Sequence, residues 1–499
     1  DAYIVKVEID ISAGLPSFAT VGLPDTAIKE SKNRVVAAIR NSGFDFPVRK
    51  VTVNLAPADI KKEGAAFDLP IALGILAATE QLSSERLRNY CILGELSLDG
   101  QVREVKGVLP ITLKLKTENL KGIILPKGNQ AEAAVVEGIK VISVESLAET
   151  VKFLKNEIEL EPYNLNLNQT FQEASLYDLD FREVKGQPFA KRALEVAAAG
   201  SHNALMIGPP GSGKTMLAKR LPTILPQLTL EESIETTKIH SVSGLIPRHR
   251  ALVATRPFRS PHHTISDIAL IGGGTYPRPG EVSLAHNGVL FLDELPEFHR
   301  DVLEVLRQPV EAGEVTISRA SSSLTFPSRF TLVCAMNPCP CGYFGHSLRE
   351  CTCTPFQIQK YMNKISGPLL DRIDLHIEVP ALKVAEITGS TGNGESSEMI
   401  RQRVIKARGI QMKRYKNEKG IFANAHLTPK LMKKYCQIDK EGENLLKTAI
   451  EHLGLSARAY DRILKVARTI ADLENSENIE PEHLAEAIQY RSLDRSFWM

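Results

Sequence analysis

The chain has 499 residues, of which 43% are hydrophobic and 24% are charged, with a formal net charge of +2. This length exceeds what one hydrophobic core supports and favours about three domains, and the near-neutral charge gives no indication of a nucleic-acid partner. We find no run of about 18 uncharged apolar residues and no charged segment leading into an apolar one at the start, so we expect no membrane span, no signal peptide and a cytoplasmic location.

An α+β domain is predicted over residues 1–158, where strand-like apolar runs alternate with helical periodicity. The strand-like runs lie at 3–11, 51–55, 122–125 and 141–144, and the helical patterns lie at 24–42, 69–80 and 130–137. Residues 159–178 contain Pro162 with several Asn and Gln, a composition typical of a linker.

The rest of the chain predicts a nucleotide-binding α/β core followed by a helical domain. Residues 179–382 run in the order strand, glycine-rich loop, helix, strand, acidic pair, helix, strand. Residues 383–397 are rich in Gly, Ser and Thr, which favours a flexible connection. Residues 398–499 show helical patterns, and Pro429 and Pro481 each stand early in a predicted helix. The expected fold class is therefore multidomain α/β with a helical carboxy-terminal domain.

A glycine-rich loop follows the apolar run at 204–207. It reads Gly208-Pro209-Pro210-Gly211-Ser212-Gly213-Lys214-Thr215 and matches the GxxxxGK[ST] pattern. Its glycines permit positive φ, so backbone N–H groups can close around phosphate oxygens at the start of a helix. We expect Lys214 to neutralise the β- and γ-phosphates of ATP and Thr215 to bind Mg²⁺. A glycine-rich turn without a ligand is the weaker alternative.

Two carboxylates end the apolar strand predicted at 289–292. A phosphate loop needs a second element that holds the metal and positions water. We therefore expect Asp293 to face the Mg²⁺ and Glu294 to polarise the attacking water. An acidic second position favours hydrolysis over mere binding.

Seven cysteines stand at 91, 334, 339, 341, 351, 353 and 436. Four of them, Cys339, Cys341, Cys351 and Cys353, form two CxC pairs on either side of a short loop. Four thiolates can complete a tetrahedral structural Zn²⁺ site, and a dense thiol cluster in a cytosolic chain favours metal over disulfides. The CxC spacing is tighter than the common CxxC, so reduced thiols and a disulfide remain alternatives.

The segment from 401 to 436 is strongly basic. Its basic residues are Arg401, Arg403, Lys406, Arg408, Lys413, Arg414, Lys416, Lys419, Lys430, Lys433 and Lys434, against the single acid Glu418. A helical face that contacts nucleic-acid phosphates and an ordinary solvated face are equally compatible with this pattern.

Three further motifs follow in a fixed order. An apolar strand ends in Asn337, residues 369–374 read Leu-Leu-Asp-Arg-Ile-Asp, and residues 456–462 read Ser-Ala-Arg-Ala-Tyr-Asp-Arg. This order resembles AAA+ ATPases. The resemblance implies that Asn337 is the sensor of the γ-phosphate and that Arg372 is an arginine finger for a neighbouring subunit's nucleotide. It implies Arg458 as the second sensor, with Arg462 as the alternative.

Two longer stretches narrow the resemblance. Residues 255–266 read Thr-Arg-Pro-Phe-Arg-Ser-Pro-His-His-Thr-Ile-Ser, followed by Gly272-Gly-Gly and Pro279-Gly-Glu. They look like the helix-2 insert of magnesium-chelatase ATPase subunits. The stretch from Asn337-Pro-Cys-Pro-Cys-Gly to Asp371-Arg372 is similar to the YifB/ComM branch of that family, and the similarity spans nearly the whole chain.

The amino-terminal domain resembles the Lon protease fold, a ribosomal-S5-domain-2-like α+β fold. Residues 53–69 occupy the nucleophile segment of that fold, and residues 94–110 occupy its lysine segment. Ala66 stands where the nucleophilic serine belongs, and Leu109 stands where its lysine belongs. A Ser-Lys dyad needs both groups, so we expect no proteolysis and a ring-forming or nucleic-acid-binding role.

The family resemblance implies a ring, most simply a hexamer, that hydrolyses ATP to move on single-stranded or branched DNA and extends recombination joints by branch migration during natural transformation. In related rings the helix-2 insert, here 255–285, and the pre-sensor hairpin, here 314–330, point into the pore. The DNA contacts this implies are Arg256, Arg259, Arg278 and Arg319, with packing at subunit interfaces as the alternative.

Two rival functions belong to other classes. One is a metal-insertion motor like magnesium chelatase, against which the cysteines and the Lon-like domain weigh. The other is a protein-remodelling ATPase that uses the Lon-like domain as a substrate adaptor. Stimulation of ATP hydrolysis by DNA distinguishes the DNA motor from both.

Overall fold

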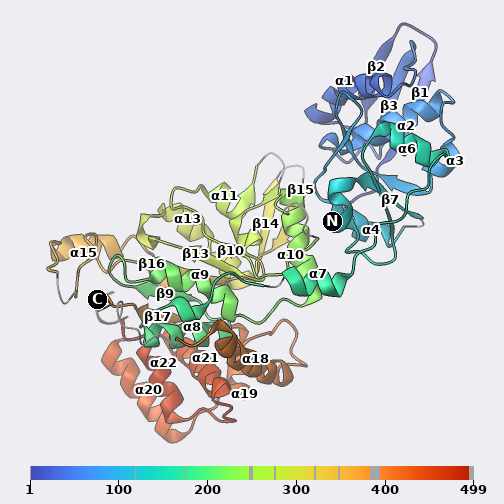
Figure 1. Cartoon of the computed structure of the whole chain (residues 1–499). Coiled ribbons are helices and arrows are strands. Elements are labelled where there is room, and N and C mark those ends of the chain that lie inside the picture. The colour runs from blue at the N-terminus through green and yellow to red at the C-terminus, as the bar shows by residue number, and fades with distance from the viewer. Residues whose placement is uncertain are drawn as a thin grey trace. The chain divides into compact units, whose positions relative to one another are not determined.

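A computed structural model describes residues 2–118, 120–174, 176–246, 251–274, 277–319, 322–346, 349–382 and 394–493, without the side chains of 168, 173, 174, 319 and 322. The chain divides into two compact units. The first combines Asp1–Ala174 with Ser233–Ala254, and the second combines Ser175–Glu232 with Thr255–Met499. Figure 1 traces the elements of both along the chain. Among the residues described, no helix is both long and apolar enough to cross a membrane.

The first unit contains two small sheets and a cover of helices. One sheet has the order β1-β3-β2, with β1 (Lys6–Ser12), β2 (Ser17–Val21) and β3 (Lys50–Ala56). The other has the order β4-β7-β8, all parallel, with β4 (Tyr90–Ile92), β7 (Gly122–Pro126) and β8 (Lys140–Val144). A short ribbon pairs β5 (Glu95–Leu96) with β6 (Val102–Arg103). The helices are α1 (Thr26–Asn41), α2 (Asp68–Ala78), α3 (Ser84–Leu87), α4 (Val108–Leu115), α5 (Gln130–Ala133), α6 (Leu147–Leu154) and α7 (Leu167–Ala174).

The core of this unit follows from the sequence pattern. Val51, Val53 and Leu55 alternate along β3 and are fully buried, as a strand with one covered face requires. Helix α2 is apolar on nearly every side and lies inside the unit, where it packs against α1 and β1. Helix α7 lies within the stretch 159–178 that the composition predicts as a linker.

Residues 233–254, which hold most of α10 (Leu230–Ser243), fold with the first unit although their place in the sequence predicts the α/β core. Ala251 and Leu252 are buried in one apolar cluster with Leu109 of α4. The Ser241 hydroxyl donates to the buried carboxylate of Glu132. This long-range packing leaves no local signal that sequence periodicity could detect.

The second unit is built on a five-stranded parallel sheet, as the sequence predicts for an α/β core. The strand order is β10-β13-β16-β9-β17. The strands are β10 (Phe258–Arg259), β13 (Val289–Leu292), β16 (Thr331–Met336), β9 (Ala204–Ile207) and β17 (Leu375–Glu378). Because all strands run the same way, the residues that follow β9, β13 and β16 meet at one edge of the sheet, where open α/β sheets bind ligands.

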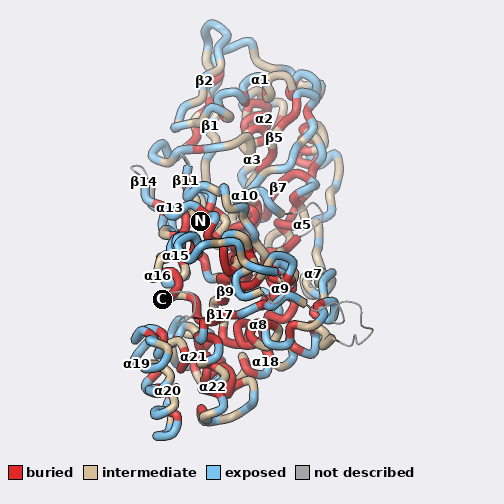
Figure 2. The backbone as a smooth tube through the Cα atoms, turned by 90° about the vertical axis from the view of Figure 1, so that its left-hand side faces the viewer, coloured by how far each residue is buried: buried red, intermediate tan, exposed pale blue. Residues whose placement is uncertain are grey.

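Alternate residues of these strands enter two separate cores. Met206, Phe291 and Val333 face a core shared with the carboxy-terminal helices, whereas their neighbours Leu205, Leu290 and Leu332 face the core on the other side. Strands buried on both faces are expected to be continuously apolar, and β9, β13 and β16 are. In Figure 2 the tube is largely red, and therefore buried, around β9, β17 and α8.

Helices and hairpins surround this sheet. The helices around the sheet are α8 (Pro188–Gly200), α9 (Lys214–Ile224), α11 (Asp267–Ile271), α12 (Glu281–Leu284), α13 (Arg300–Val305), α14 (Arg307–Ala312), α15 (Pro355–Met362) and α16 (Gly367–Leu370). The hairpins pair β11 (Gly272–Gly273) with β12 (Arg278–Pro279), and β14 (Glu314–Arg319) with β15 (Ser322–Pro327). The carboxy-terminal helices are α18 (Ser397–Arg414), α19 (Pro429–Tyr435), α20 (Lys440–Leu453), α21 (Ala457–Leu473) and α22 (Pro481–Gln489).

The carboxy-terminal helices α18 and α21 pack against α8, which in turn lies against β17 of the sheet (Figure 1). His202 next to α8 bonds the buried Thr469 hydroxyl of α21 at 2.7 Å. Gln411 of α18 donates to the carbonyl of Ala199 at 3.1 Å. The carboxy-terminal region is helical, as the sequence predicts, and it shares one core with the sheet of the second unit. Most of the predicted flexible connection, residues 383–393, lies outside the described part of the chain.

Candidate active site

The phosphate loop, residues 208–215, joins the end of β9 to the start of α9. Gly211 and Gly213 adopt φ of 78° and 96°, a region that residues with a Cβ rarely enter. A Cβ at Gly208 would lie 2.1 Å from the carbonyl oxygen of Val379, so only glycine fits there. The Ser212 hydroxyl is buried and has no hydrogen-bond partner among the described residues. The loop is thus a cradle with a polar group left over for a ligand.

Lys214 occupies the centre of this cradle. Its ammonium group donates to the carbonyls of Gly208 at 2.6 Å and Pro209 at 2.9 Å and to the Asn337 side-chain oxygen at 3.2 Å. Burial lowers its pKa to about 8, although the carboxylates of Asp293 and Glu294 oppose that shift. Phosphate oxygens would take over these acceptor positions and restore the full charge of the ammonium.

The two acidic residues that follow β13 lie beside the phosphate loop. The Thr215 hydroxyl donates to Asp293 Oδ2 at 2.7 Å, which brings together the two oxygen ligands expected for Mg²⁺. Glu294 follows in a left-handed conformation with φ of 53°, rare for a residue with a side chain. Its backbone N–H donates to Asp293 Oδ1 at 3.0 Å, which fixes that turn. The residues present fit a Mg²⁺–triphosphate ligand.

His263 is a site residue that the sequence reading did not single out. Its Nδ1 lies 3.5 Å from Glu294 Oε2, and its ring contacts the rings of His262 and Phe298. It belongs to the 255–266 stretch, so that motif carries the signal that could have identified it. A histidine beside the expected catalytic carboxylate can hold that carboxylate in one orientation.

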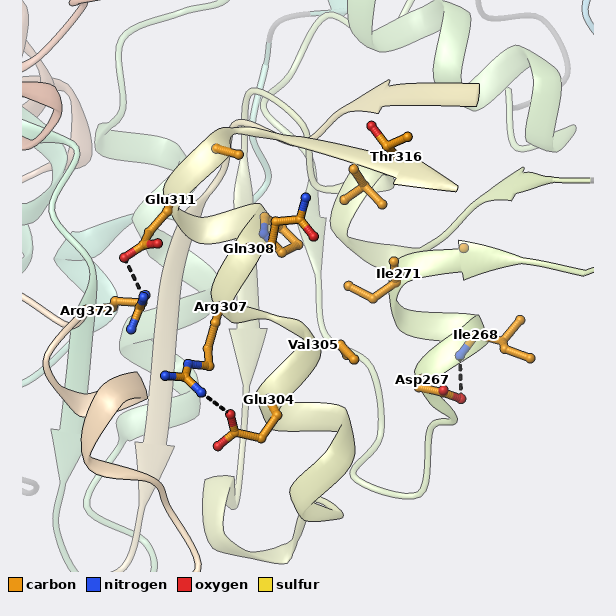
Figure 3. Close-up of a pocket in the computed structure, with 14 residues that line it drawn as sticks. Asp267, Ile268, Ile271, Glu304, Val305, Arg307, Gln308, Glu311, Thr316 and Arg372 are labelled. Atoms are coloured by element: carbon orange, nitrogen blue, oxygen red, sulfur yellow. Dashed lines mark hydrogen bonds and ion pairs between the residues drawn. The ribbon is translucent and has the colours of Figure 1, made fainter. Parts of the chain in front are cut away.

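Arg372 is not among the described contacts of Lys214 and is instead held by Pro368 and Glu311. Its guanidinium donates to the Pro368 carbonyl at 2.6 Å and pairs with Glu311 Oε1 at 2.5 Å, while its Nε is buried without a partner in the described structure. Figure 3 shows Arg372 and Glu311 pointing toward one another beside the pair Arg307 and Glu304. These four residues line an open pocket of about 810 Å³.

A second pocket, of about 160 Å³, brings the three predicted arginines together, with Arg372, Arg458 and Arg462 all in its lining. Arg458 is 64% exposed and pairs with Asp371 at 3.2 Å. Arg462 is largely covered and lies 2.9 Å from Oδ1 of the buried Asp374. Burial raises the pKa of Asp374, but Arg462 and His202 outweigh it and hold that pKa below its ordinary value.

The four cysteines of the two CxC pairs, here called the thiol cluster, come together as a group. Their sulfur atoms all lie within 4.8 Å of one another, and all seven cysteines are free. The Sγ atoms of Cys339 and Cys341 are 3.3 Å apart, against about 2.05 Å in a disulfide, so the structure contains no bond there. Cys339 is fully buried and the other three are half-buried.

Two of the four arginines predicted to contact DNA, Arg256 and Arg259, form hydrogen bonds or ion pairs within the second unit. The Arg256 side chain is 11% exposed, and its guanidinium donates to the carbonyls of Pro226, Gln227 and Asn287. Arg259 forms a two-pronged pair with Glu281 at 2.6 and 2.7 Å. Both arginines therefore have partners within the unit, and their contact with DNA stays a prediction.

The other two predicted DNA contacts belong to the hairpins. Arg278 is exposed on β12. Arg319 ends β14, and its side chain lies outside the described structure. In the basic segment, Arg403 pairs with Glu395 and Glu195, and Arg414 pairs with Asp472. These two arginines form ion pairs within the second unit, whereas the lysines of the segment are exposed to solvent.

Comparisons with known proteins agree with these motifs. Three family profiles match: "Magnesium chelatase, subunit ChlI" at residues 180–387, "Subunit ChlI of Mg-chelatase" at 7–129 and "Magnesium chelatase, subunit ChlI C-terminal" at 394–491. Competence protein ComM of Haemophilus influenzae is 46% identical over 99% of this chain and 96% of its own length. The YifB protein of Escherichia coli is 44% identical over 98% and 94%. Lon protease 2 of Bacillus subtilis is 27% identical over 28% of this chain and 26% of its own.

Proposed function

Because the chain belongs to the YifB/ComM family of magnesium chelatase-like AAA+ ATPases, we propose that it forms a hexameric ring that converts ATP hydrolysis into movement on DNA. The proposed task is helicase-like branch migration of recombination joints during natural transformation. The relative from Haemophilus influenzae is a competence protein, which supports this setting.

The chemistry proposed at the phosphate loop uses residues already in contact. Lys214 would hold the β- and γ-phosphates, and Thr215 with Asp293 would hold Mg²⁺. Bound Mg²⁺ would neutralise charge that develops on the phosphates. Glu294 would take the proton of the attacking water, and Asn337, within reach of Lys214, would orient that water at the γ-phosphate.

The observation that carries the ring proposal is the second pocket. Arg372, Arg458 and Arg462 gather there beside Asp371. Within the described part of the chain, none of the three arginines contacts Lys214, Thr215 or Asp293. An arginine finger must reach the γ-phosphate to stabilise the transition state. We infer that this arginine group serves the nucleotide of a neighbouring subunit.

Mixing two inactive variants tests this inference. Lys214→Ala removes the phosphate contact, and Arg372→Ala removes the finger, so each ring alone should be inactive. In a randomly mixed ring about one interface in four pairs an intact loop with an intact finger, so about a quarter of the wild-type turnover should return. No recovery on mixing under conditions that exchange subunits would contradict a shared site.

The two hairpins support the choice of DNA. A Cβ at Gly272 of β11 would lie 2.8 Å from the Ile317 side chain of β14, so the helix-2 insert and the pre-sensor hairpin lie side by side. Arg278 is exposed on one hairpin and Arg319 ends the other. Two adjacent hairpins with basic ends can follow a phosphate backbone through a pore.

The first unit supports a non-proteolytic role. Ala66 lies in a short 3₁₀ turn (Ala65–Phe67), and Leu109 is fully buried with its N–H donating to Glu132 at 2.8 Å. Neither position offers a nucleophile or an amine. We propose that this Lon-like unit helps to form the ring or to bind nucleic acid.

DNA stimulation is the test of the proposed function. Single-stranded or branched DNA should raise ATP turnover, rising salt should weaken DNA binding steeply, and Arg278→Ala should weaken it at every sequence alike. Lys214→Ala serves as the control without turnover. Equal hydrolysis rates with and without DNA, together with no strand displacement, would favour a magnesium-chelatase-like or protein-remodelling ATPase instead.

A further inference from the structure

The thiol cluster lies at the end of the strand that carries Asn337. We propose that its four cysteines hold one Zn²⁺ and that this metal positions Asn337 and Pro210, so that turnover of ATP depends on an occupied zinc site. The proposal rests on the ATPase chemistry proposed above and assigns a second metal to it, distinct from Mg²⁺. The thiol cluster is linked to the ATP site in two ways, through the short chain segment from Cys339 back to Asn337 and through the contact of Gly342 with the phosphate loop.

The sulfur geometry fits a tetrahedral metal. With Zn–S bonds of about 2.3 Å, the edges of the tetrahedron measure about 3.8 Å. Cys351 Sγ lies 3.7 Å from Cys339 Sγ and 3.6 Å from Cys341 Sγ. Four soft thiolate ligands without a carboxylate or histidine select zinc over Mg²⁺ or Ca²⁺.

The surrounding backbone already serves these sulfurs. The N–H of Phe344 points at Cys339 Sγ at 3.3 Å, and the N–H of Cys341 points at Cys353 Sγ at 3.4 Å. Such donors stabilise negative charge on metal-bound thiolates and orient them. Without a metal, four thiols so close together would gain little from one another.

The first link to the ATP site runs along the chain. Cys339 is two residues beyond Asn337, and it is fully buried. Asn337 is also contacted from α15, where its backbone N–H donates to the Tyr361 hydroxyl oxygen. Helix α15 begins directly after the second CxC pair, at a capping box formed by Thr354 and Gln357. A metal that joins the two pairs would therefore clamp β16 and α15 around the sensor residue.

The second link is a contact between loops. Gly342 follows Cys341 with φ of 84°, and a Cβ placed there would lie 2.6 Å from Pro210 of the phosphate loop. The loop after the first CxC pair thus packs against the ATP cradle itself. A displacement of about 1 Å at a positioned catalytic group can cost about 100-fold in rate.

Metal analysis is the first test. Purified protein should contain about one Zn²⁺ per chain, Cys351→Ser should lose it, and Cys91→Ser, outside the cluster, should keep it. Stripping the zinc should lower kcat for basal ATP hydrolysis about tenfold or more, and added Zn²⁺ should restore it. Protein without zinc as purified, or stripped protein with unchanged kcat, would overturn the proposal.

A nucleotide comparison separates positioning from general loss of structure. ADP lacks the γ-phosphate that Asn337 would contact, so zinc removal should weaken ATP binding more than ADP binding. We expect the preference for ATP over ADP to fall at least about threefold, with the ADP affinity nearly constant. Equal weakening of both nucleotides would contradict a role at the sensor.

A pair of glycine variants tests the loop contact with the thiols intact. Gly342→Ala meets Pro210, whereas Gly345→Ala, at φ of 75°, has nothing within 4 Å of its new Cβ. Both carry the same backbone strain, and both should retain zinc. Only Gly342→Ala should lower kcat, and equal kcat in the two variants would refute the coupling. This test does not depend on zinc removal, so it remains decisive where the stripped protein is too unstable to assay. All of these assays are performed without DNA. A failure of DNA to stimulate hydrolysis would therefore contradict the proposed function and leave the zinc proposal standing.

Discussion

The buried ammonium of Lys214 makes ATP affinity depend on pH in a range where ordinary lysines stay charged. Its pKa of about 8 results from burial in the phosphate loop, which Asp293 and Glu294 offset only in part. A bound triphosphate would favour the charged form strongly, so ATP binding above pH 8 must be accompanied by proton uptake.

The size of the effect follows from this pKa. The apparent Kd rises by the factor 1 + 10^(pH − 8), which is about 1.1 at pH 7 and about 11 at pH 9. The expected loss of affinity is therefore about tenfold, or about 1.4 kcal/mol. A lysine with the ordinary pKa of about 10.4 would change affinity by only a few per cent over the same range.

Fluorescence titration with a labelled ATP analogue and constant free Mg²⁺ measures this dependence. Lys214→Arg provides the control, because arginine stays protonated throughout and should give a flat profile. A change of less than about twofold in the wild-type protein would refute the burial argument, and so would an equal loss in the arginine variant.

The remaining predictions concern groups around the site. Glu294→Gln should lower kcat at least about 100-fold while ATP binding remains, as single-turnover and binding assays can show. His263→Ala frees the Glu294 carboxylate and should lower kcat about tenfold without changing the melting temperature, whereas a loss of fold would mean a purely structural role. Arg462→Ala leaves the buried Asp374 without its arginine partner and should lower the free energy of unfolding by about 3 kcal/mol in denaturant titrations. Arg458→Ala, at an exposed pair, should change stability by less than about 1 kcal/mol, and equal losses in the two variants would contradict their assigned environments.

The sequence predicts the site best where the chemistry is local. The phosphate loop, its strand and its helix lie within one short stretch, so glycine spacing and apolar runs are enough to define them. Parallel strands then bring Asp293 and Asn337 to the same edge, which follows from strand direction alone.

Contacts between distant residues limit the prediction elsewhere. Arg256 has the residue type of a DNA contact, but three backbone carbonyls that need donors hold it inside the unit. Residues 233–254 leave the ATPase unit for an apolar cluster around Leu109. His263 becomes a site residue only because the fold places it beside Glu294. Periodicity carries no information about such partners.

Displacement of a labelled strand from a three-stranded DNA junction tests the central claim most directly. The wild-type protein with ATP and Mg²⁺ should extend the joint and release the strand, and Lys214→Ala should leave the junction intact at the same protein concentration. Wild-type protein that hydrolyses ATP yet releases no more strand than Lys214→Ala would contradict the proposal that this ATPase is a motor on DNA.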